Sequence, residues 1–292
     1  MRVRIERDIV FGEGRIGFHD ADGPAKTIPL RLDAYLPEQQ MAAPVPALVM
    51  AFGGAFHRGS KENDAFSDGV GTSTSVAHYC HHFASLGMAA FSVQYRLAQV
   101  DPEPGTPLLT EPDRVPMSRI NPVRVEMGLP PAEPRAMAGI MEAAFDDVAA
   151  AVAFITSHSG DFGVDPARIV LGGFSAGGRC AMYVAYGKRV GVAGVISLSG
   201  PLVPADAAAF LADGRPVPPL LLISGERDLD YVVRFVPELE HHFQTAGADA
   251  QSLVLPGATH FYAAETPTRE GSTVRDVMAE AIRRWVGPLV SI

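Results

Sequence analysis

Cysteine is scarce in this sequence, because only Cys80 and Cys180 occur among its 292 residues. Two cysteines cannot build the disulfide framework that stabilises small secreted proteins. Basic residues are also in deficit, since 24 Lys and Arg stand against 33 Asp and Glu, and the net charge is −9. An acidic balance of this kind argues against nucleic acid or an anionic membrane as a partner.

Long apolar runs are absent as well, and stretches such as "PLLLISG" are far too short to cross a bilayer. The first ten residues, "MRVRIERDIV", lack the apolar core and cleavage site of a secretion signal. These features predict a cytoplasmic protein. No G-x-x-x-x-G-K-[ST] or G-x-G-x-x-G stretch follows a strand pattern, so we predict no nucleotide and no other cofactor.

What remains is a composition typical of a globular α/β protein, with 47% apolar and 20% charged residues. Short buried-strand patterns alternate with amphipathic helical patterns along the chain, which favours a mostly parallel sheet with helices on both faces. Strands are predicted at 27–37, 46–52, 88–97, 168–174, 192–200, 217–225 and 250–257. Helices are predicted at 75–87, 141–159, 175–187, 233–247 and 272–286.

One segment breaks this alternation. Residues 98–140 contain nine prolines and almost no apolar periodicity. A long irregular stretch inside a compact domain is usually functional or disordered. Composition does not shift enough to divide the chain, so we predict a single domain over 1–292 in which this Pro-rich insert covers the active site.

The strongest local motif is "GGFSAGG", which places Ser175 in a G-x-S-x-G match between a predicted strand and a predicted helix. A serine on such a turn has a strained backbone and an exposed hydroxyl, and its neighbours at 173 and 177 need to lack a Cβ atom. The following helix directs N–H groups towards the site. This context predicts that Ser175 is a nucleophile.

The stretch "GVDPARIVLGGFSAGG", together with "YRLA" at 95–98, resembles α/β-hydrolase serine esterases of the hormone-sensitive-lipase and feruloyl- or acetyl-esterase kind. The resemblance runs from about residue 27 to residue 286, and only the Pro-rich insert departs from it clearly. It implies the α/β-hydrolase fold. Related esterases often form dimers, so it also admits a homodimer.

A nucleophilic serine needs a histidine base and an orienting carboxylate, which follow it in this fold in the order acid, then histidine. Asp228 and His260 each come at the end of a late predicted strand. The G-x-x-D spacing of the family selects Asp228, while Asp230 and, more weakly, Glu226 remain alternatives. We therefore predict a triad of Ser175, Asp228 and His260.

An ester hydrolase also needs N–H donors for the oxyanion that forms on the carbonyl oxygen. The family motif H-G-G-G-F-x-x-G-S aligns without a gap on "FGGAFHRGS" (52–60), which we name the oxyanion loop. The alignment assigns the donors as the backbone amides of Gly54 and Ala55, and a third is that of Ala176. Phe52 replaces the motif histidine, so packing, His57 or Arg58 is expected to hold the loop.

These features together predict a serine carboxylesterase that hydrolyses a small or medium-sized ester through an acyl-enzyme. The alternatives are an amide hydrolase of the same fold, such as an arylformamidase or a peptidase, and a non-catalytic ligand-binding relative. Aromatic side chains are expected to line the substrate pocket, and the candidates are Phe52, Phe56, Phe174 and Phe261.

Three histidines on one predicted helix are candidate metal ligands. His78, His81 and His82 share a helix face, and Cys80 is close in sequence. No carboxylate or further ligand cluster completes a coordination shell, so we predict a polar helix face and no metal.

Overall fold

The computed structural model describes residues 1–19, 26–39 and 41–289. Its centre is an eight-stranded sheet in the order β1-β2-β4-β3-β5-β6-β7-β8. β2 pairs antiparallel with β1 and β4, and all pairs from β3 onward are parallel. The strands are β1 (Val3–Ile16), β2 (Lys26–Pro37), β3 (Val45–Ala51), β4 (Ala89–Val93), β5 (Val164–Phe174), β6 (Gly194–Leu198), β7 (Leu220–Arg227) and β8 (Ala250–Thr259).

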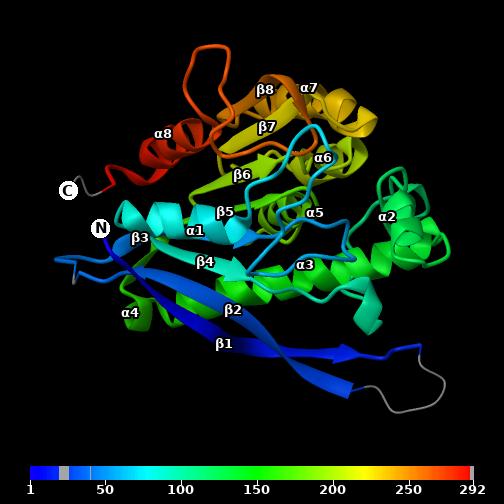
Figure 1. The fold of residues 1–292 in the computed structure, drawn as a ribbon, viewed down its shortest axis with the longest axis horizontal. Coiled ribbons are helices and arrows are strands. Elements are labelled where there is room, and N and C mark those ends of the chain that lie inside the picture. The colour runs from blue at the N-terminus through cyan, green and yellow to red at the C-terminus, as the bar shows by residue number, and fades with distance from the viewer. Residues whose placement is uncertain (20–25, 40, 290–292) are drawn as a thin grey trace.

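Helices cover both faces of this sheet, as the alternating pattern predicts. α1 lies in front of the strands in Figure 1, with α8 above it, while α3 passes behind β4. The helices are α1 (Val76–Ser85), α2 (Ile120–Glu126), α3 (Pro134–Ser157), α4 (Ser159–Phe162), α5 (Ala176–Met182), α6 (Pro204–Leu211), α7 (Asp230–Thr245) and α8 (Val274–Val286). The turns η1 (Ala98–Val100) and η2 (Pro112–Arg114) are 3-10 helical, and η3 (Tyr183–Gly187) is π-helical.

The central strands are apolar throughout because both of their faces are covered. All seven residues of β3 are buried, as are the five of β4 and the five of β6. A strand of a one-sided sheet would alternate apolar and polar residues instead. The prediction of a mostly parallel sheet with two helical layers is therefore confirmed.

Several elements were not expected from the sequence, among them β1, α6 and α2. β1 is long and pairs with β2, but register shifts between Glu6 and Ile9 and between Val10 and Gly12 disturb its side-chain alternation. α6 is short and rich in alanine. α2 lies inside the Pro-rich insert, at the right in Figure 1.

The insert is shorter than predicted and is attached to the helices beneath it. α3 begins at Pro134, so residues 134–140 belong to a helix and not to an irregular segment. Glu142 accepts hydrogen bonds from the backbone amides of Leu108 and Leu109 at 2.6 and 3.0 Å. Asp206 of α6 accepts one from the Thr110 amide at 2.7 Å. Carboxylates thus replace the secondary-structure partners that a proline-rich chain lacks.

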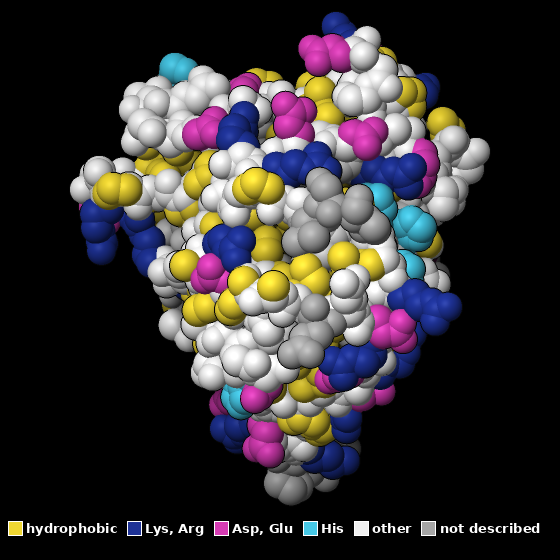
Figure 2. Space-filling view, turned by 90° about the vertical axis from the view of Figure 1, so that its left-hand side faces the viewer, with side chains coloured by type: hydrophobic (Ala, Val, Ile, Leu, Met, Phe, Trp, Pro, Cys, Tyr) yellow, Lys and Arg dark blue, Asp and Glu magenta, His cyan; other side chains and the backbone are white. Residues whose placement is uncertain are grey.

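The ends of the central strands define two opposite sides of the molecule. The central parallel strands point to the right in Figure 1, where α2 lies, and the N-terminus is at the opposite side. Figure 2 shows this opposite side, on which basic and acidic side chains are interspersed. The side chains of the described residues form no large patch of one charge sign on this side. Within the described residues, no helix combines the length and the apolar character needed to cross a bilayer.

Candidate active site

Ser175 lies at the sharp turn between β5 and α5. Its backbone is in the left-handed region, with φ of 52° and ψ of −113°, which a non-glycine residue adopts only under strain. A Cβ atom at Gly177 would come within 2.0 Å of the Ala51 carbonyl oxygen, and one at Gly173 within 2.4 Å of the Gly177 backbone. The expectation that both flanking positions must lack a Cβ atom is confirmed.

His260 and Asp228 converge on this serine from the ends of β8 and β7. The Nε2 atom of His260 lies 2.9 Å from the Ser175 Oγ atom, and its Nδ1 atom lies 2.6 Å from Asp228 Oδ1. All three residues are at least nine-tenths buried. Asp228 is thus the carboxylate that meets the histidine. Asp230 begins α7, and Glu226 accepts a hydrogen bond from the Gly257 amide.

The carboxylate of Asp228 is held by donors other than His260. The Ser199 hydroxyl donates to Oδ2 at 2.5 Å, the Gly225 amide donates to the same atom at 3.1 Å, and the Leu229 amide donates to Oδ1 at 2.7 Å. Ser199 has φ of 53°, the same left-handed region as Ser175. Ser199 was not predicted as a site residue, although its position just after β6 puts it at the same edge of the sheet.

Three backbone amides near Ser175 have no acceptor within the described residues. They belong to Gly54 and Ala55, the positions predicted from the motif alignment, and to Ala176, which follows the nucleophile. Gly54 has φ of 127°, and a Cβ atom there would come within 1.9 Å of the Arg58 carbonyl oxygen. Ala55 has φ of 56°, so alanine in place of the motif glycine costs about 1–2 kcal/mol of strain. These amides can donate to an oxygen atom on the substrate.

Hydrogen bonds and a stacked aromatic pair hold the oxyanion loop in this strained shape. Asp64 accepts hydrogen bonds from the Gly53 and Val76 amides, both at 2.8 Å. The Tyr95 hydroxyl donates to the Phe52 carbonyl oxygen at 2.8 Å, and the two rings stack with centroids 4.2 Å apart. Asp64 and Tyr95 were not predicted to play this part.

A histidine does brace the loop, from a different position than in the family motif. His57 is fully buried, and its Nδ1 atom lies 2.8 Å from the Ala55 carbonyl oxygen, to which Nδ1–H donates. Its Nε2 atom accepts a hydrogen bond from Arg124 of α2 at 2.9 Å. Burial lowers the pKa of His57 against the effect of the Ala55 hydrogen bond, and the Arg124 charge lowers it further. His57 therefore links the loop to the insert as a neutral imidazole.

The expectation that Phe52 lines the substrate pocket is wrong. Its side chain is fully buried in the stack with Tyr95. Of the four phenylalanines, Phe56 lines the cavity beside Ser175, while Phe174 and Phe261 pack against the imidazole of His260 with ring centroids 5.4 and 5.1 Å from it. Phe52 supports the oxyanion loop and does not line the cavity beside Ser175.

The cavity beside Ser175 is small and has an unusual lining. Its volume is about 20 Å³, room for little more than one water-sized group. The oxyanion loop provides Ala55 and Phe56, and the insert closes it from above. The remaining lining residues are Pro116, Arg119 and Ile120 of the insert, Ala176 and Arg179 of α5, and Tyr231 of α7.

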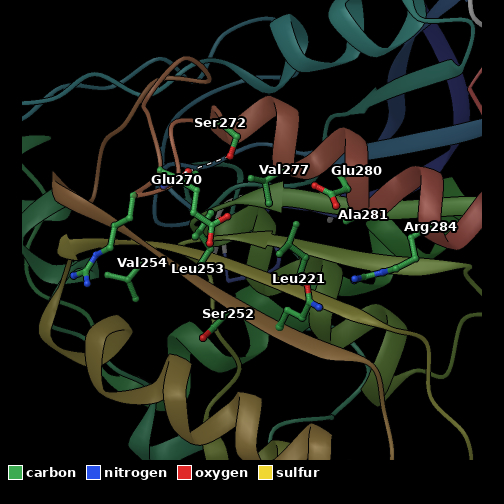
Figure 3. Close-up of a pocket in the computed structure, with 13 residues that line it drawn as sticks. Leu221, Ser252, Leu253, Val254, Glu270, Ser272, Val277, Glu280, Ala281 and Arg284 are labelled. Atoms are coloured by element: carbon green, nitrogen blue, oxygen red, sulfur yellow. Dashed lines mark hydrogen bonds between the residues drawn. The ribbon is translucent and has the colours of Figure 1, made fainter.

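A larger cavity of about 700 Å³ lies away from the triad, between β8, α8 and residues 268–272 (Figure 3). Its walls are mostly polar. Glu270 and Arg284 approach it from opposite sides, and the hydroxyls of Thr268 and Ser272 are hydrogen-bonded at 3.0 Å. Ser175, Asp228 and His260 do not line it. Size alone would select this cavity, but it offers no nucleophile beside a base, so the candidate active site is the small one.

One acidic cluster could resemble a metal site. Carboxylate oxygens of Asp8, Asp33 and Glu62 lie within 4.8 Å of one another. The Lys61 ammonium group occupies their centre, 2.7 Å from Asp33 and 3.1 Å from Asp8, and also pairs with Glu62. Burial alone would lower the pKa of Lys61, but these hydrogen bonds raise it. The cluster is therefore an ion-pair network around a lysine.

Comparisons with known proteins agree with the fold. Esterase 2 of the planctomycete Thermogutta terrifontis, phosphoramylated by tabun, matches with a TM-score of 0.64 at 17% identity, over 99% of this chain and 97% of that one. The hyperthermophilic esterase of the archaeon Pyrobaculum calidifontis matches with a TM-score of 0.59 at 20% identity, over 96% and 85%. At these identities, the likeness shows the α/β-hydrolase fold alone.

Sequence comparison is more specific about the family. Mouse (Mus musculus) lysophospholipase-like protein 1 is 33% identical over 100 residues, which are 34% of this chain and 42% of that protein, so the match spans less than half of either. The model of the dienelactone hydrolase family matches residues 66–286. The narrower resemblance to hormone-sensitive-lipase esterases is not supported by these matches. Most of the chain is covered by that single family model, and the chain belongs to the dienelactone hydrolase family.

Proposed function

We propose that this hydrolase is a serine carboxylesterase that cleaves small or medium-sized esters through an acyl-enzyme on Ser175. The observation that carries the proposal is the continuous path from Asp228 Oδ1 through His260 to the Ser175 Oγ atom, with contacts of 2.6 and 2.9 Å. A base within hydrogen-bond reach of a nucleophile, oriented by a third group, is the arrangement that acyl transfer requires.

In the first half-reaction, the Ser175 oxygen attacks the ester carbonyl carbon while His260 Nε2 takes the hydroxyl proton. Asp228 stabilises the resulting imidazolium through the Nδ1–H hydrogen bond. The negative charge on the former carbonyl oxygen is met by the free amides of Gly54, Ala55 and Ala176. One such donor commonly contributes about 3–4 kcal/mol to the transition state.

Collapse of the tetrahedral intermediate breaks the bond to the alcohol oxygen, which takes the proton from His260 Nε2 as it leaves. Water then attacks the acyl-enzyme, and His260 removes a proton from that water. A second tetrahedral intermediate forms at the same amides and collapses to the free acid, while His260 returns the proton to the Ser175 oxygen.

The restricted cavity favours short acyl groups. Related esterase structures from Thermogutta terrifontis are described as propionate-bound and butyrate-bound. We therefore expect acetyl to butyryl esters to be the best members of a 4-nitrophenyl ester series. Matched amides of the same acyl groups test the amide-hydrolase alternative.

The deciding experiment combines covalent labelling with one substitution. A fluorophosphonate should add once per chain, on Ser175 in a peptide map, and Ser175→Ala should abolish both the label and ester hydrolysis, with a loss of about ten-thousand-fold or more. Ser157→Ala, at an exposed helix end, is the matched control and should change neither. Ester turnover retained by folded Ser175→Ala would refute the proposal.

A further inference from the structure

Ser199 combines a strained backbone with a buried side chain at the reaction centre. It follows β6 directly, its φ is 53°, and only 1% of it is exposed. A glycine adopts this left-handed conformation without strain, whereas a serine does so at a cost in stability. Such conformations persist where the surrounding structure enforces them, and they cluster at functional sites. The strain therefore points to a role for the hydroxyl group that a glycine could not fill.

The backbone around Ser199 joins the nucleophile turn to the strand that precedes the acid. The amide of Ser175 donates to the Leu198 carbonyl oxygen at 2.7 Å, and the Ser199 amide donates to the Ile223 carbonyl oxygen of β7 at 2.8 Å. A Cβ atom at Gly200 would come within 2.2 Å of the Ser175 carbonyl oxygen. The position of Ser199 is thus fixed with respect to both the nucleophile and the end of β7.

The hydroxyl group of Ser199 contacts the oxygen of Asp228 that does not face the histidine. Asp228 Oδ1 lies 2.6 Å from His260 Nδ1, whereas Oδ2 accepts a hydrogen bond from the Ser199 hydroxyl at 2.5 Å. Among the described side chains, only those of Ser199 and His260 donate to this carboxylate. A hydrogen bond to a charged acceptor is stronger than one between neutral groups. Rotation of the carboxylate about its Cβ–Cγ bond would break both contacts together.

Tyr262 is a second neighbour of the Ser199 hydroxyl. The Tyr262 hydroxyl donates to the Ile223 carbonyl oxygen at 2.9 Å and lies 3.1 Å from the Ser199 oxygen. Burial, and after it the charge of Asp228, raises the pKa of Tyr262 well above its ordinary value, and burial also raises the pKa of Tyr231, so neither group is charged near neutrality. The charged carboxylate is a closer and stronger acceptor than the phenol. The single proton of the Ser199 hydroxyl therefore lies towards Asp228.

We propose that Ser199 is a positioning residue for ester hydrolysis, and that its hydroxyl group holds Asp228 in the orientation in which Oδ1 meets His260. This inference rests on the proposed function and adds a residue to the same site. Without the hydroxyl, the carboxylate is free to rotate away from the imidazole. Loss of one donor also leaves the carboxylate more basic, so the His260–Asp228 pair keeps its proton to a higher pH.

Hydrolysis of 4-nitrophenyl acetate between pH 5 and pH 9, followed at the isosbestic wavelength of the product, tests both effects. In Ser199→Ala we expect kcat to fall by about tenfold or more, because the base is no longer aligned, while KM changes by less than about threefold. The midpoint of the acid limb of kcat/KM should rise by about half a pH unit or more. A kcat within about twofold of the natural value, or a lower kcat with an unchanged midpoint, would overturn the inference.

Two further variants separate the hydroxyl group from its surroundings. Ser199→Gly also lacks the hydroxyl but relieves the backbone, so it should behave like Ser199→Ala in kcat and midpoint, and it decides if Ser199→Ala fails to fold. Recovery of activity in Ser199→Gly would contradict the inference. Ser197→Ala is the matched control, because its buried hydroxyl donates only to the Gly200 carbonyl oxygen, at 2.9 Å. The midpoint should be unchanged in Ser197→Ala, and an equal shift there would refute a specific role for Ser199.

Failure of this inference and failure of the esterase proposal are distinguishable, because the hydrogen bond between His260 and Asp228 is observable by itself. Its Nδ1–H proton gives a low-field resonance in the proton NMR spectrum, assigned by its loss in His260→Ala. We expect this resonance to move or broaden in both Ser199 variants and to stay in place in Ser197→Ala. A resonance unchanged in the Ser199 variants would refute the positioning role even in an active esterase. If it moves while the natural protein cleaves no ester, the positioning of Asp228 stands and the esterase proposal fails.

Discussion

At the scale of single residues, Asp64 is a buried carboxylate on which the shape of the oxyanion loop depends. Its carboxylate is 1% exposed and holds the Gly53 amide of the oxyanion loop and the first amide of α1. Burial raises its pKa to about 6, even though both amides donate to it. The group that shapes the loop therefore exchanges its proton near neutrality.

The proton of Asp64 gives stability a specific pH dependence. The folded pKa of about 6 lies above the ordinary value of 3.8, so between these values the folded chain holds a proton that the unfolded chain has lost. Stability from this group is therefore greatest at low pH and falls as pH rises towards 6, by up to about 3 kcal/mol. Asp64→Asn cannot titrate.

Urea unfolding of both proteins from pH 4 to pH 7 measures this effect. The free energy of unfolding of the natural protein minus that of Asp64→Asn should decrease over this interval and level off above pH 6. Asp113→Asn serves as the control, because Asp113 is exposed and its hydrogen bond to Arg135 lowers its pKa. A difference that stays constant with pH would show that Asp64 does not titrate in this range.

The catalytic candidates were accessible to sequence reasoning because each follows a strand directly. Asp228 and His260 come one residue after β7 and β8, so the local pattern that locates the strand also locates the side chain. Ser199 also follows a strand, β6, directly. Its role could not be predicted because it depends on a hydrogen bond to a carboxylate 29 residues away, which no local pattern shows.

At the scale of elements, α2 connects the insert to the reaction centre. Arg124 donates to His57 Nε2 at 2.9 Å and through its Nε–H to the Pro130 carbonyl oxygen at 2.6 Å. A second link from α2 joins Glu126 to Arg58 at 2.9 Å. The oxyanion loop and the insert are therefore coupled. A shift of α2 would move the His57 imidazole and, through it, the Ala55 carbonyl oxygen.

Arg124→Met should loosen this coupling. Loss of the hydrogen bond to buried His57 leaves an acceptor without its donor, which costs about 1–3 kcal/mol locally. We expect thermolysin to cut within 110–133 several-fold faster and kcat/KM for a short ester to fall by about tenfold. Arg114→Met, which loses only an exposed pair with Glu111, is the control. Equal cleavage rates in the two variants would contradict the coupling.

The elements that sequence patterns missed lack the regular apolar periodicity on which such predictions rest. The periodicity of β1 is disturbed by register shifts, and Asp8 within it has φ of 57°. In α2 a proline and an asparagine stand among its seven residues, so tertiary contacts with the rest of the insert stabilise it. The strands β3, β6 and β7 were found because two-sided burial leaves an unmistakable apolar run.

At the scale of the whole molecule, one hydrophobic core joins all layers. It includes Phe11 of β1, the central strands and Val286 of α8. Continuity of this kind supports the proposal that the chain forms one domain, with the insert attached to it by hydrogen bonds to Glu142 and Asp206.

A single domain should unfold as one unit. Trp285, the only tryptophan, packs against Gly194 at the start of β6 and reports on the interior of the sheet. We expect urea transitions followed by its fluorescence and by far-ultraviolet circular dichroism to coincide, because no part of the core is independent. Two separated midpoints would show that part of the chain unfolds by itself.

Phe52 replaces the motif histidine, and other residues support the oxyanion loop in its place. This affects how proteins with such a loop can be recognised. The loop keeps its free amides although its first residue is an aromatic ring, because Tyr95, Asp64 and His57 supply the support. A search pattern that demands histidine before the glycines would pass over this chain. A structural pattern that requires left-handed backbone at residues 54 and 55 together with the G-x-S-x-G turn would find it. Such a pattern describes the backbone of the loop and not the side chains that support it.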